Sequence, residues 1–138
     1  MRFALAFTLS VLSLPLLAQP VPAQEAQAVR KVIEAQLQAF QRDDAERAFR
    51  YAAPGIQDMF RTPDAFMDMV RKSYAVVYRP RNVVFRNPVR VGKDVVQPVR
   101  MTDEDGHPWL VVYPMERQPD GSWRINGCEI APLPGEET

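Results

Sequence analysis

The hydrophobic pattern of this chain changes once, close to Tyr78. Before that residue, apolar side chains recur at steps of three and four, which is the spacing of a helix buried along one side. After it, short runs of β-branched and aromatic residues are broken by proline and glycine, which is typical of strands and turns. Helices followed by an antiparallel meander predict an α+β fold, with the helices packed on one face of the sheet.

Three helices are predicted in the N-terminal half. The first covers residues 25–44, and its apolar stripe consists of Val29, Val32, Ile33, Leu37 and Phe40. A short second helix is expected within residues 43–55, with an N-cap at Asp43 or Asp44 and a stop at Pro54-Gly55. The third is expected within residues 61–74, because a threonine followed by proline and aspartate is a strong helix start.

The C-terminal half predicts a curved, cone-like antiparallel sheet of four to five strands. The strands are expected at Val83–Phe85, Val95–Met101, Trp109–Gln118 and Trp123–Ile130, with a small extra strand around Val89–Val91. Asp105-Gly106 and Asp120-Gly121 supply the positive φ that hairpin turns need, so they join the last three strands.

Pairing across the second turn places one set of large side chains on a single face of the sheet. This set comprises Trp109, Val111, Tyr113, Met115, Trp123 and Ile125. Gly127 interrupts the alternation, so a bulge or bend is expected there, with Cys128 and Ile130 facing inward after it. Large aromatic residues gathered in this way favour a core that is covered by the helices.

The N-terminal segment has the pattern of a signal peptide. One basic residue, Arg2, precedes an apolar run over residues 3–17, which is too short to span a bilayer comfortably. A cut after Ala23 is predicted, and cuts after Ala18 or Ala28 are alternatives. An uncleaved membrane anchor is the competing interpretation of the same segment.

Removal of residues 1–23 leaves one domain over residues 24–131 and a disordered tail over residues 132–138. The expected location is the periplasm or the outside of the cell, and contact with the membrane is expected only transiently, through the signal peptide. Because the chain has a single cysteine, Cys128, it cannot form an internal disulfide, and its core must suffice for stability.

The charges of the chain balance, with 17 basic and 17 acidic residues, which gives no reason to expect a nucleic-acid partner. Between Arg71 and Arg100, however, eight basic residues occur with a single acid, Asp94. This run is either a solvated surface of the sheet or a contact region for an anionic partner.

Several segments carry a resemblance to known proteins. AFQRDDAERAFRYAAPGIQDMF, YRPRNVVF and YPMERQPDGSWRINGC resemble a family of exported bacterial proteins known as a domain of unknown function, over roughly residues 27–131. The third helix start, TPDAF, and the meander ending in DGSWRI are similar to the cone-shaped superfamily of nuclear transport factor two and ketosteroid isomerase. This resemblance implies a bent sheet with a pocket at its open end, but no particular reaction.

No catalytic residue, cofactor or metal site is predicted. Isomerases of that superfamily use a carboxylate base in an apolar pocket, and no acid of this chain lies at a matching position. A Cys128–His107 pair is a weaker alternative to a buried, inert thiol. Likewise, a copper(I) site formed by Met59, Met67 and Met69 is a less favoured interpretation than the use of these residues in core packing.

The predicted function is a non-enzymatic one. The chain is expected to bind a small apolar or anionic ligand at the mouth of the cone, or to form a homodimer through its sheet face. The candidate ligand contacts are Tyr78, Trp109, Tyr113 and Met115. The alternative is a pocket enzyme of the isomerase or hydratase type, which would require a buried carboxylate beside Tyr78 or Tyr113.

Overall fold

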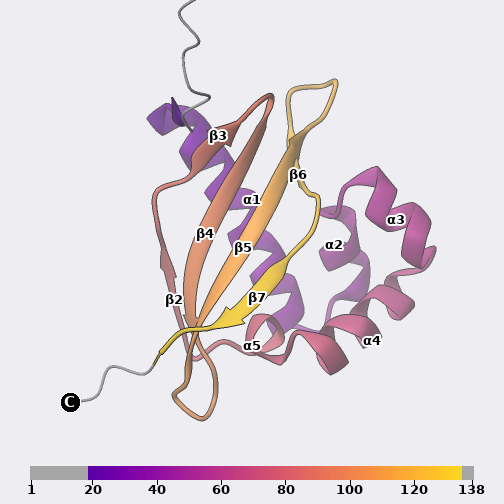
Figure 1. Ribbon diagram of the computed structural model, residues 1–138. Coiled ribbons are helices and arrows are strands. Elements are labelled where there is room, and N and C mark those ends of the chain that lie inside the picture. The colour runs from indigo at the N-terminus through magenta and orange to yellow at the C-terminus, as the bar shows by residue number, and fades with distance from the viewer. Residues whose placement is uncertain (1–18, 135–138) are drawn as a thin grey trace, which may run out of the picture.

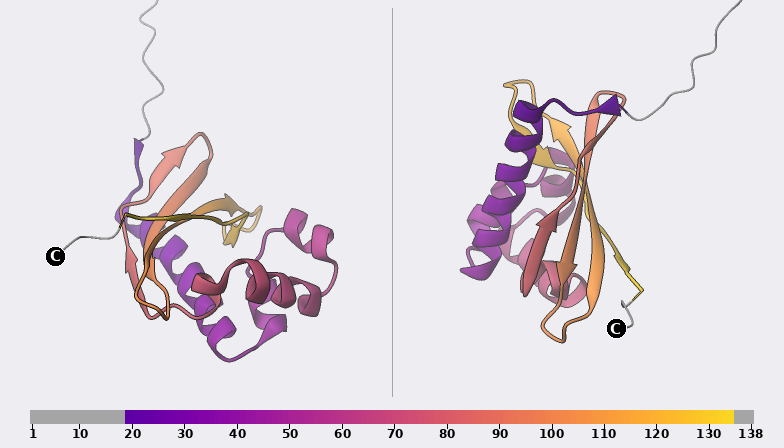
Figure 2. Two further views of the ribbon diagram at one scale, coloured as in Figure 1. Left: turned by 60° about the horizontal axis from the view of Figure 1, so that its bottom comes forward. Right: turned by 90° about the vertical axis from the view of Figure 1, so that its left-hand side faces the viewer.

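In a computed structural model of the chain, the helices lie together on one face of an open antiparallel sheet (Figure 1 and Figure 2). The structure describes residues 19–134. Most of the predicted signal peptide, residues 1–18, and the end of the predicted tail, residues 135–138, lie outside the described residues. The predicted α+β class, with helices packed on an antiparallel sheet, is confirmed.

The element counts differ from the prediction. Residues 19–134 contain five helices and seven strands, where three helices and four to five strands were expected. The helices are α1 (Ala23–Gln41), α2 (Ala45–Arg50), α3 (Pro54–Phe60), α4 (Pro63–Ser73) and α5 (Ala75–Tyr78). None of the helices in this part of the chain is both long enough and apolar enough to cross a bilayer.

The helix starts follow from local capping chemistry. The Asp44 side chain accepts a hydrogen bond from the Arg47 backbone N–H at 3.1 Å and begins α2. Thr62 caps α4 in the same way, as predicted. Pro54, however, begins α3 instead of only ending α2, because the first turn of a helix has no use for the N–H that proline lacks.

Two long strands form the centre of the sheet. The strands are β1 (Gln19–Pro20), β2 (Asn82–Phe85), β3 (Val89–Val91), β4 (Asp94–Thr102), β5 (Pro108–Arg117), β6 (Trp123–Ile125) and β7 (Glu129–Pro132). β4 pairs with β5. On its other edge, β4 pairs with β2 at one end and with β3 at the other. On its other edge, β5 pairs with β6 at one end and with β7 at the other. β1 extends the sheet beyond β3.

The expected last strand is divided in two at Gly127. Pro114 on β5 has no N–H to offer a neighbouring strand, although its carbonyl accepts from the Asn126 N–H at 2.8 Å. Gly127 has φ +141° and lies against the Pro114 ring. The predicted bend is therefore confirmed, and it separates β6 from β7.

The ordered backbone reaches beyond residue 131. Pro132 belongs to β7, and the Leu133 N–H donates to the Pro108 carbonyl at 3.0 Å. At the other end, the strand β1 (Gln19–Pro20) lies before residue 24, where the domain was expected to begin.

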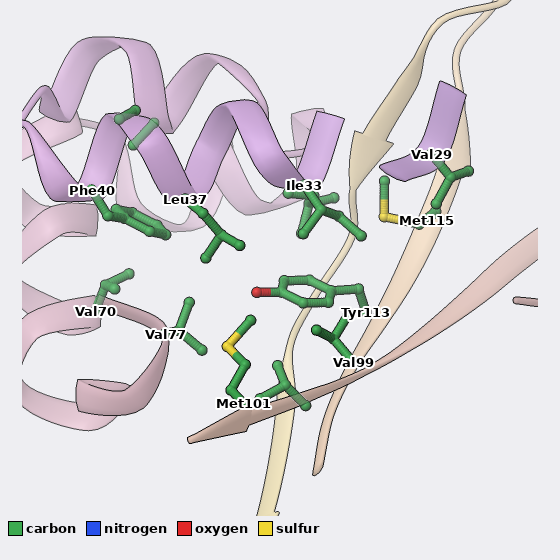
Figure 3. Close-up of a cluster of buried hydrophobic side chains, with 14 of the residues drawn as sticks. Val29, Ile33, Leu37, Phe40, Val70, Val77, Val99, Met101, Tyr113 and Met115 are labelled. Atoms are coloured by element: carbon green, nitrogen blue, oxygen red, sulfur yellow. The ribbon is translucent and has the colours of Figure 1, made fainter. Parts of the chain in front are cut away.

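The core lies between α1 and the sheet, as the apolar patterns predicted (Figure 3). The stripe of α1 is buried except for Val32, which is partly buried. The predicted face of β5 and β6 is buried at Val111, Tyr113, Met115, Trp123 and Ile125, while Trp109 packs at its margin. Burial of these large side chains provides the main driving force for the fold.

The segment between α2 and α3 is attached directly to the sheet. The Ile125 N–H donates to the Tyr51 carbonyl, and the Ala53 N–H donates to the Ile125 carbonyl, both at 2.8 Å. These bonds hold the start of α3 beside β6. They thereby place α3 next to the gap between β6 and β7.

Candidate functional site

A cavity of about 610 Å³ lies between the helices and the strands β5 to β7. This volume is within the range of small-molecule sites in proteins. Its walls are mostly apolar. The lining residues are Gln36, Phe40, Ala52, Ile56, Met59, Phe60, Phe66, Met69, Val70, Ser73, Tyr74, Val77, Tyr113, Pro114, Ile125, Asn126, Gly127, Cys128 and Glu129.

One wall of the cavity is aromatic and is centred on Phe66 of α4. The Phe66 ring lies 5.5 Å from that of Phe49, 5.7 Å from that of Phe60 and 6.1 Å from that of Phe40, measured between ring centroids. Tilted and edge-on rings at these distances attract one another in addition to burying apolar area. This cluster therefore provides a stable apolar wall.

The helix α3 forms the outer side of the cavity through Ile56, Met59 and Phe60. None of its residues is fully buried, and the Met59 side chain is 73% exposed. The sequence pattern did not predict a helix over these residues. A proline at its first position and apolar residues at steps of three and four are the signals that could have revealed it.

Tyr113 carries the most unusual polar group of the site. Its residue is 1% exposed, and within residues 19–134 its hydroxyl has no hydrogen-bond partner. Figure 3 shows this hydroxyl directed away from β5, toward the helix side chains that include Phe40, Val70 and Val77, all of which line the cavity. Burial raises the pKa of Tyr113 well above its ordinary value, so the hydroxyl stays protonated and can donate.

Cys128 is a second group of the cavity wall with a shifted pKa. Burial, and to a smaller extent the nearby Glu129 carboxylate, raises the pKa of the Cys128 thiol to about 12. Because the thiolate is the reactive form, this thiol is a poor nucleophile at neutral pH. The alternative partner, His107, lies in the β4–β5 turn with a 74% exposed side chain near Asp103.

The cavity contains little charge. Glu129 is the one ionisable carboxylate among its lining residues, it is exposed, and no arginine, lysine or histidine lines the cavity. The basic run between Arg71 and Arg100 does not converge on it. Arg71 and Arg79 pair with Asp43, and Arg90 pairs with Glu25.

The four predicted ligand contacts do not share one cavity. Tyr113 lines the main cavity, whereas Met115 is fully buried in the core. Tyr78 and Trp109 line a second hollow of about 400 Å³ between α5 and the β4–β5 turn. Among the methionines considered for copper, Met67 is buried in the core, while Met59 and Met69 line the main cavity.

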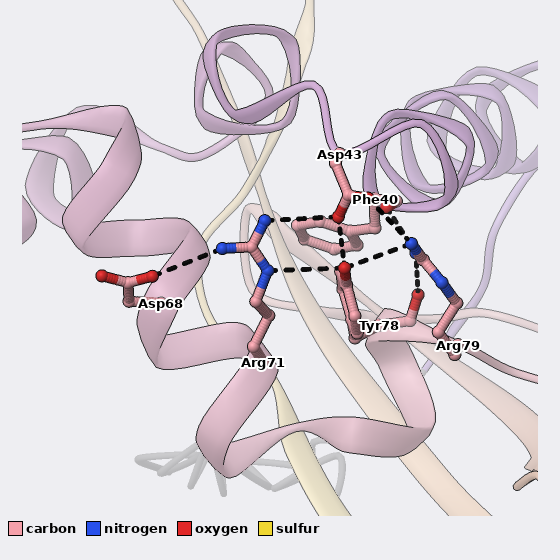
Figure 4. A network of polar contacts seen from close by, with 6 residues as sticks. All are labelled: Phe40, Asp43, Asp68, Arg71, Tyr78 and Arg79. Carbon is pink, nitrogen blue, oxygen red and sulfur yellow. Dashed lines mark hydrogen bonds and ion pairs between the residues drawn. The ribbon is translucent and has the colours of Figure 1, made fainter.

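A polar cluster of Asp43, Arg71, Tyr78 and Arg79 holds the helix layer together (Figure 4). The Asp43 carboxylate accepts from Arg71 Nη2 at 3.3 Å, from Arg79 Nη2 at 3.1 Å and from the Tyr78 hydroxyl. The Arg79 guanidinium also stacks 4.0 Å from the centre of the Tyr78 ring. The Tyr78 hydroxyl is thus used within the protein.

The β4–β5 turn contains, within residues 19–134, a group of side chains close enough to hold a metal ion: Asp103, Asp105 and His107. Asp103 Oδ1 already accepts the backbone N–H groups of Asp105 and His107, at 3.0 and 2.8 Å. Asp103 Oδ2 accepts from Trp109 Nε1 at 2.9 Å. These bonds account for the group as part of a hairpin turn.

Among known proteins, the chain matches one family model and neither a curated protein nor a solved structure. The family model described as Domain of unknown function (DUF4864) matches residues 22–138, a range that contains the helices α1 to α5 and the strands β2 to β7. The chain therefore belongs to the DUF4864 family, a domain of unknown function.

Proposed function

We propose that the mature chain is an exported protein that binds a neutral, largely apolar small molecule in the 610 Å³ cavity. The bound molecule places one oxygen against the Tyr113 hydroxyl. The observation that carries this proposal is that hydroxyl, which is buried, protonated and without a partner in residues 19–134.

The energetic argument rests on the cost of an unpaired buried group. Leaving a hydroxyl without a hydrogen bond costs about 1–3 kcal/mol, so native proteins rarely keep one without a use. A ligand oxygen at the Tyr113 hydroxyl removes this cost. Contact with the Phe66 wall supplies the apolar part of the affinity.

A neutral ligand is favoured over an anionic one. An anion placed beside Tyr113 would lose its hydration, and no cationic side chain lines the cavity to compensate for that loss. The Glu129 carboxylate at the wall would repel it further. Of the two ligand classes expected from the sequence, the apolar one is therefore retained.

The enzyme alternative lacks its main requirement. An isomerase-type mechanism needs a buried carboxylate base close to the hydroxyl donor. Glu129 lines the cavity but is exposed to solvent. Asp43 and Asp120 are exposed, Asp103 is half-buried in the β4–β5 turn, and hydrogen bonds lower the pKa of each of them.

A fluorescent ketone provides a direct test of the proposal. Prodan is a neutral naphthalene with one carbonyl oxygen, and its emission reports both an apolar environment and hydrogen bonding. We expect it to bind, and Tyr113→Phe to weaken binding about 5- to 10-fold, as loss of one hydrogen bond implies. Tyr51→Phe, the same change outside the cavity lining, serves as the control.

Two outcomes would contradict the proposal. One is a failure of prodan, and of neutral naphthalene derivatives of similar size, to bind the folded protein. The other is equal weakening by Tyr113→Phe and Tyr51→Phe, which would place the probe elsewhere.

A further inference from the structure

The buried side of α1 contains one polar residue, Gln36. Its residue is 3% exposed, and the other buried residues of this helix are apolar. Gln36 and Phe40 lie one turn apart on the same side of α1, and both of them line the main cavity. Burial of an amide in apolar surroundings is costly unless its donor and acceptor groups find partners.

The amide nitrogen of Gln36 has a partner within the protein. Nε2 donates a hydrogen bond to the Ala48 carbonyl of α2 at 3.1 Å. This bond fixes the orientation of the amide, because the reverse orientation would place two oxygen atoms against each other. Within residues 19–134 no group donates to Gln36 Oε1, so the acceptor side of this amide remains available at the cavity wall.

Tyr113 presents the opposite kind of group to the same cavity. Its hydroxyl is buried and protonated, and it has no partner in residues 19–134. In Figure 3 this hydroxyl is directed toward the helix side chains that include Leu37 and Phe40, which are the residue after Gln36 and the residue one turn further along α1. The cavity therefore has a buried donor on the sheet side and a buried acceptor on the α1 side.

A purely structural role explains the nitrogen of Gln36 but not its oxygen. Gln57 of α3 has such a role: its Nε2 donates to the carbonyls of Phe49 and Ala52 at 3.0 and 3.1 Å, and it does not line the main cavity. Gln57 is only half-buried, so burial does not impose the same cost on its oxygen. The buried oxygen of Gln36 calls for a donor that enters the cavity.

We infer that Gln36 Oε1 accepts a hydrogen bond from the ligand of this cavity, while the Tyr113 hydroxyl donates one to it. The inference rests on the proposed function and narrows the class of ligand: the molecule carries an O–H or N–H group at its acceptor end. Alcohols, phenols and secondary amides have this chemistry, whereas ketones, ethers and tertiary amides lack the donor. A ketone such as prodan still binds through Tyr113, but without the second hydrogen bond.

Two pairs of naphthalene derivatives test this inference by isothermal titration calorimetry. N-methyl-2-naphthamide carries an N–H that N,N-dimethyl-2-naphthamide lacks, and 2-naphthol carries an O–H that 2-methoxynaphthalene lacks. In each pair the compound without the donor has one more methyl group, so apolar burial alone would favour it. We expect the compound with the donor to bind about 5- to 10-fold more tightly in at least one pair. The pair that shows this preference distinguishes an amide ligand from a hydroxyl ligand.

The variant Gln36→Met assigns the preference to the Gln36 oxygen. Methionine resembles glutamine in length but offers only a weak acceptor. The variant should therefore lose the preference of about 5- to 10-fold and keep its affinity for the donor-free compounds within about 2-fold. Gln57→Met is the matched control, because it also removes an amide that donates to backbone carbonyls, and it should retain the preference. Near-ultraviolet circular dichroism checks that both variants are folded.

Failure of this inference can be told from failure of the proposed function. If the donor-free compounds bind and Tyr113→Phe weakens them, but neither pair shows a preference for the donor, the role of Gln36 is overturned and the ligand oxygen beside Tyr113 stands. A preference that survives in Gln36→Met, or that Gln57→Met removes as fully, overturns it as well. If none of the compounds binds the folded protein, the proposed function fails too. Because the preference is measured first on the unmodified protein, the inference can be contradicted even if Gln36→Met does not fold.

Discussion

The phenolic hydroxyl of Tyr78 donates a hydrogen bond to the carboxylate of Asp43 and joins the end of α5 to the loop after α1. Asp43 adopts φ +52°, a left-handed conformation that aspartate and asparagine tolerate better than most residues. Arg71 and Arg79 complete the cluster from α4 and from the residue after α5. Because α4 and α5 also contribute to the wall of the cavity, this contact helps to set its shape.

The Asp43 cluster predicts a specific dependence of stability on pH. The Tyr78 hydrogen bond, followed by the two guanidinium groups, lowers the pKa of Asp43 below its ordinary value of 3.8. A lowered pKa in the folded state stabilises the protein above about pH 4, and this stabilisation is lost as the pH falls through the folded value. Asp43→Asn, which preserves the tolerance of positive φ, should reduce stability at pH 7 and flatten its decline below pH 4.

Urea unfolding at pH 3 and pH 7 measures this effect. Asp58→Asn is the control, because Asp58 is exposed on α3 and makes no ion pair within residues 19–134. If both variants show the pH dependence of the unmodified protein, the cluster does not stabilise the fold.

Much of the fold could be predicted because period and turn chemistry agree along most of the chain. The stripe of α1 and the alternation on β5 determine which faces are buried, and Asp-Gly turns determine the pairing of strands. Pro54 was interpreted as a stop, although proline can equally begin a helix, so α3 was missed. The number of strands was too low because β1 depends on pairing with β3, which no local pattern indicates.

The candidate site could be predicted only in part. Tyr113 was identified because it belongs to an aromatic face, but sequence cannot distinguish a buried hydroxyl that has a partner from one that lacks it. Tyr78 was assigned to a ligand, whereas its hydroxyl is occupied by Asp43 and the two arginines. That contact joins positions 35 residues apart, and no spacing rule connects them.

Gly127 is expected to tolerate no larger residue. Its φ of +141° is strained for any side chain, and an added Cβ would lie 3.3 Å from the Pro114 ring. Gly127→Ala should reduce the free energy of unfolding by about 1–3 kcal/mol, measured by urea titration. Gly55→Ala is the matched control: it has open space in α3 and should be neutral or stabilise by about 0.5 kcal/mol. Equal effects of the two changes would show that the β6–β7 bend is not constrained.

Cys128 should react slowly with thiol reagents in the folded protein. Its pKa of about 12, against the ordinary 9.0, lowers the thiolate fraction at pH 8 about 1,000-fold. The rate with dithionitrobenzoate should therefore be about 1,000-fold lower in the folded protein than in urea. A ratio below about 10 would mean that the thiol ionises readily and would reopen its assignment as inert.

The mature N-terminus should be Gln24. A cut after Ala23 removes β1 but leaves α1 almost complete, whereas a cut after Ala28 would also remove Glu25. Glu25 pairs with Arg90 and, at 3.6 Å, with Arg117, so its loss would detach the start of α1 from the sheet. Intact mass measurement of the protein recovered from a bacterial periplasm distinguishes these cuts. A mass that retains residues 1–23 would contradict both the cut and the proposed export.

Replacement of Tyr113 by phenylalanine should affect stability and ligand binding in opposite directions. In the free protein the hydroxyl is buried without a partner in residues 19–134, so Tyr113→Phe should increase the free energy of unfolding by about 1 kcal/mol. Prodan at saturating concentration should stabilise the unmodified protein more than the variant, because a ligand stabilises the folded state in proportion to its affinity. Urea unfolding with and without prodan measures both effects. A Tyr113→Phe variant that is destabilised by 1 kcal/mol or more without prodan would mean that the hydroxyl supports the fold itself, and the case for a ligand oxygen beside it would be lost.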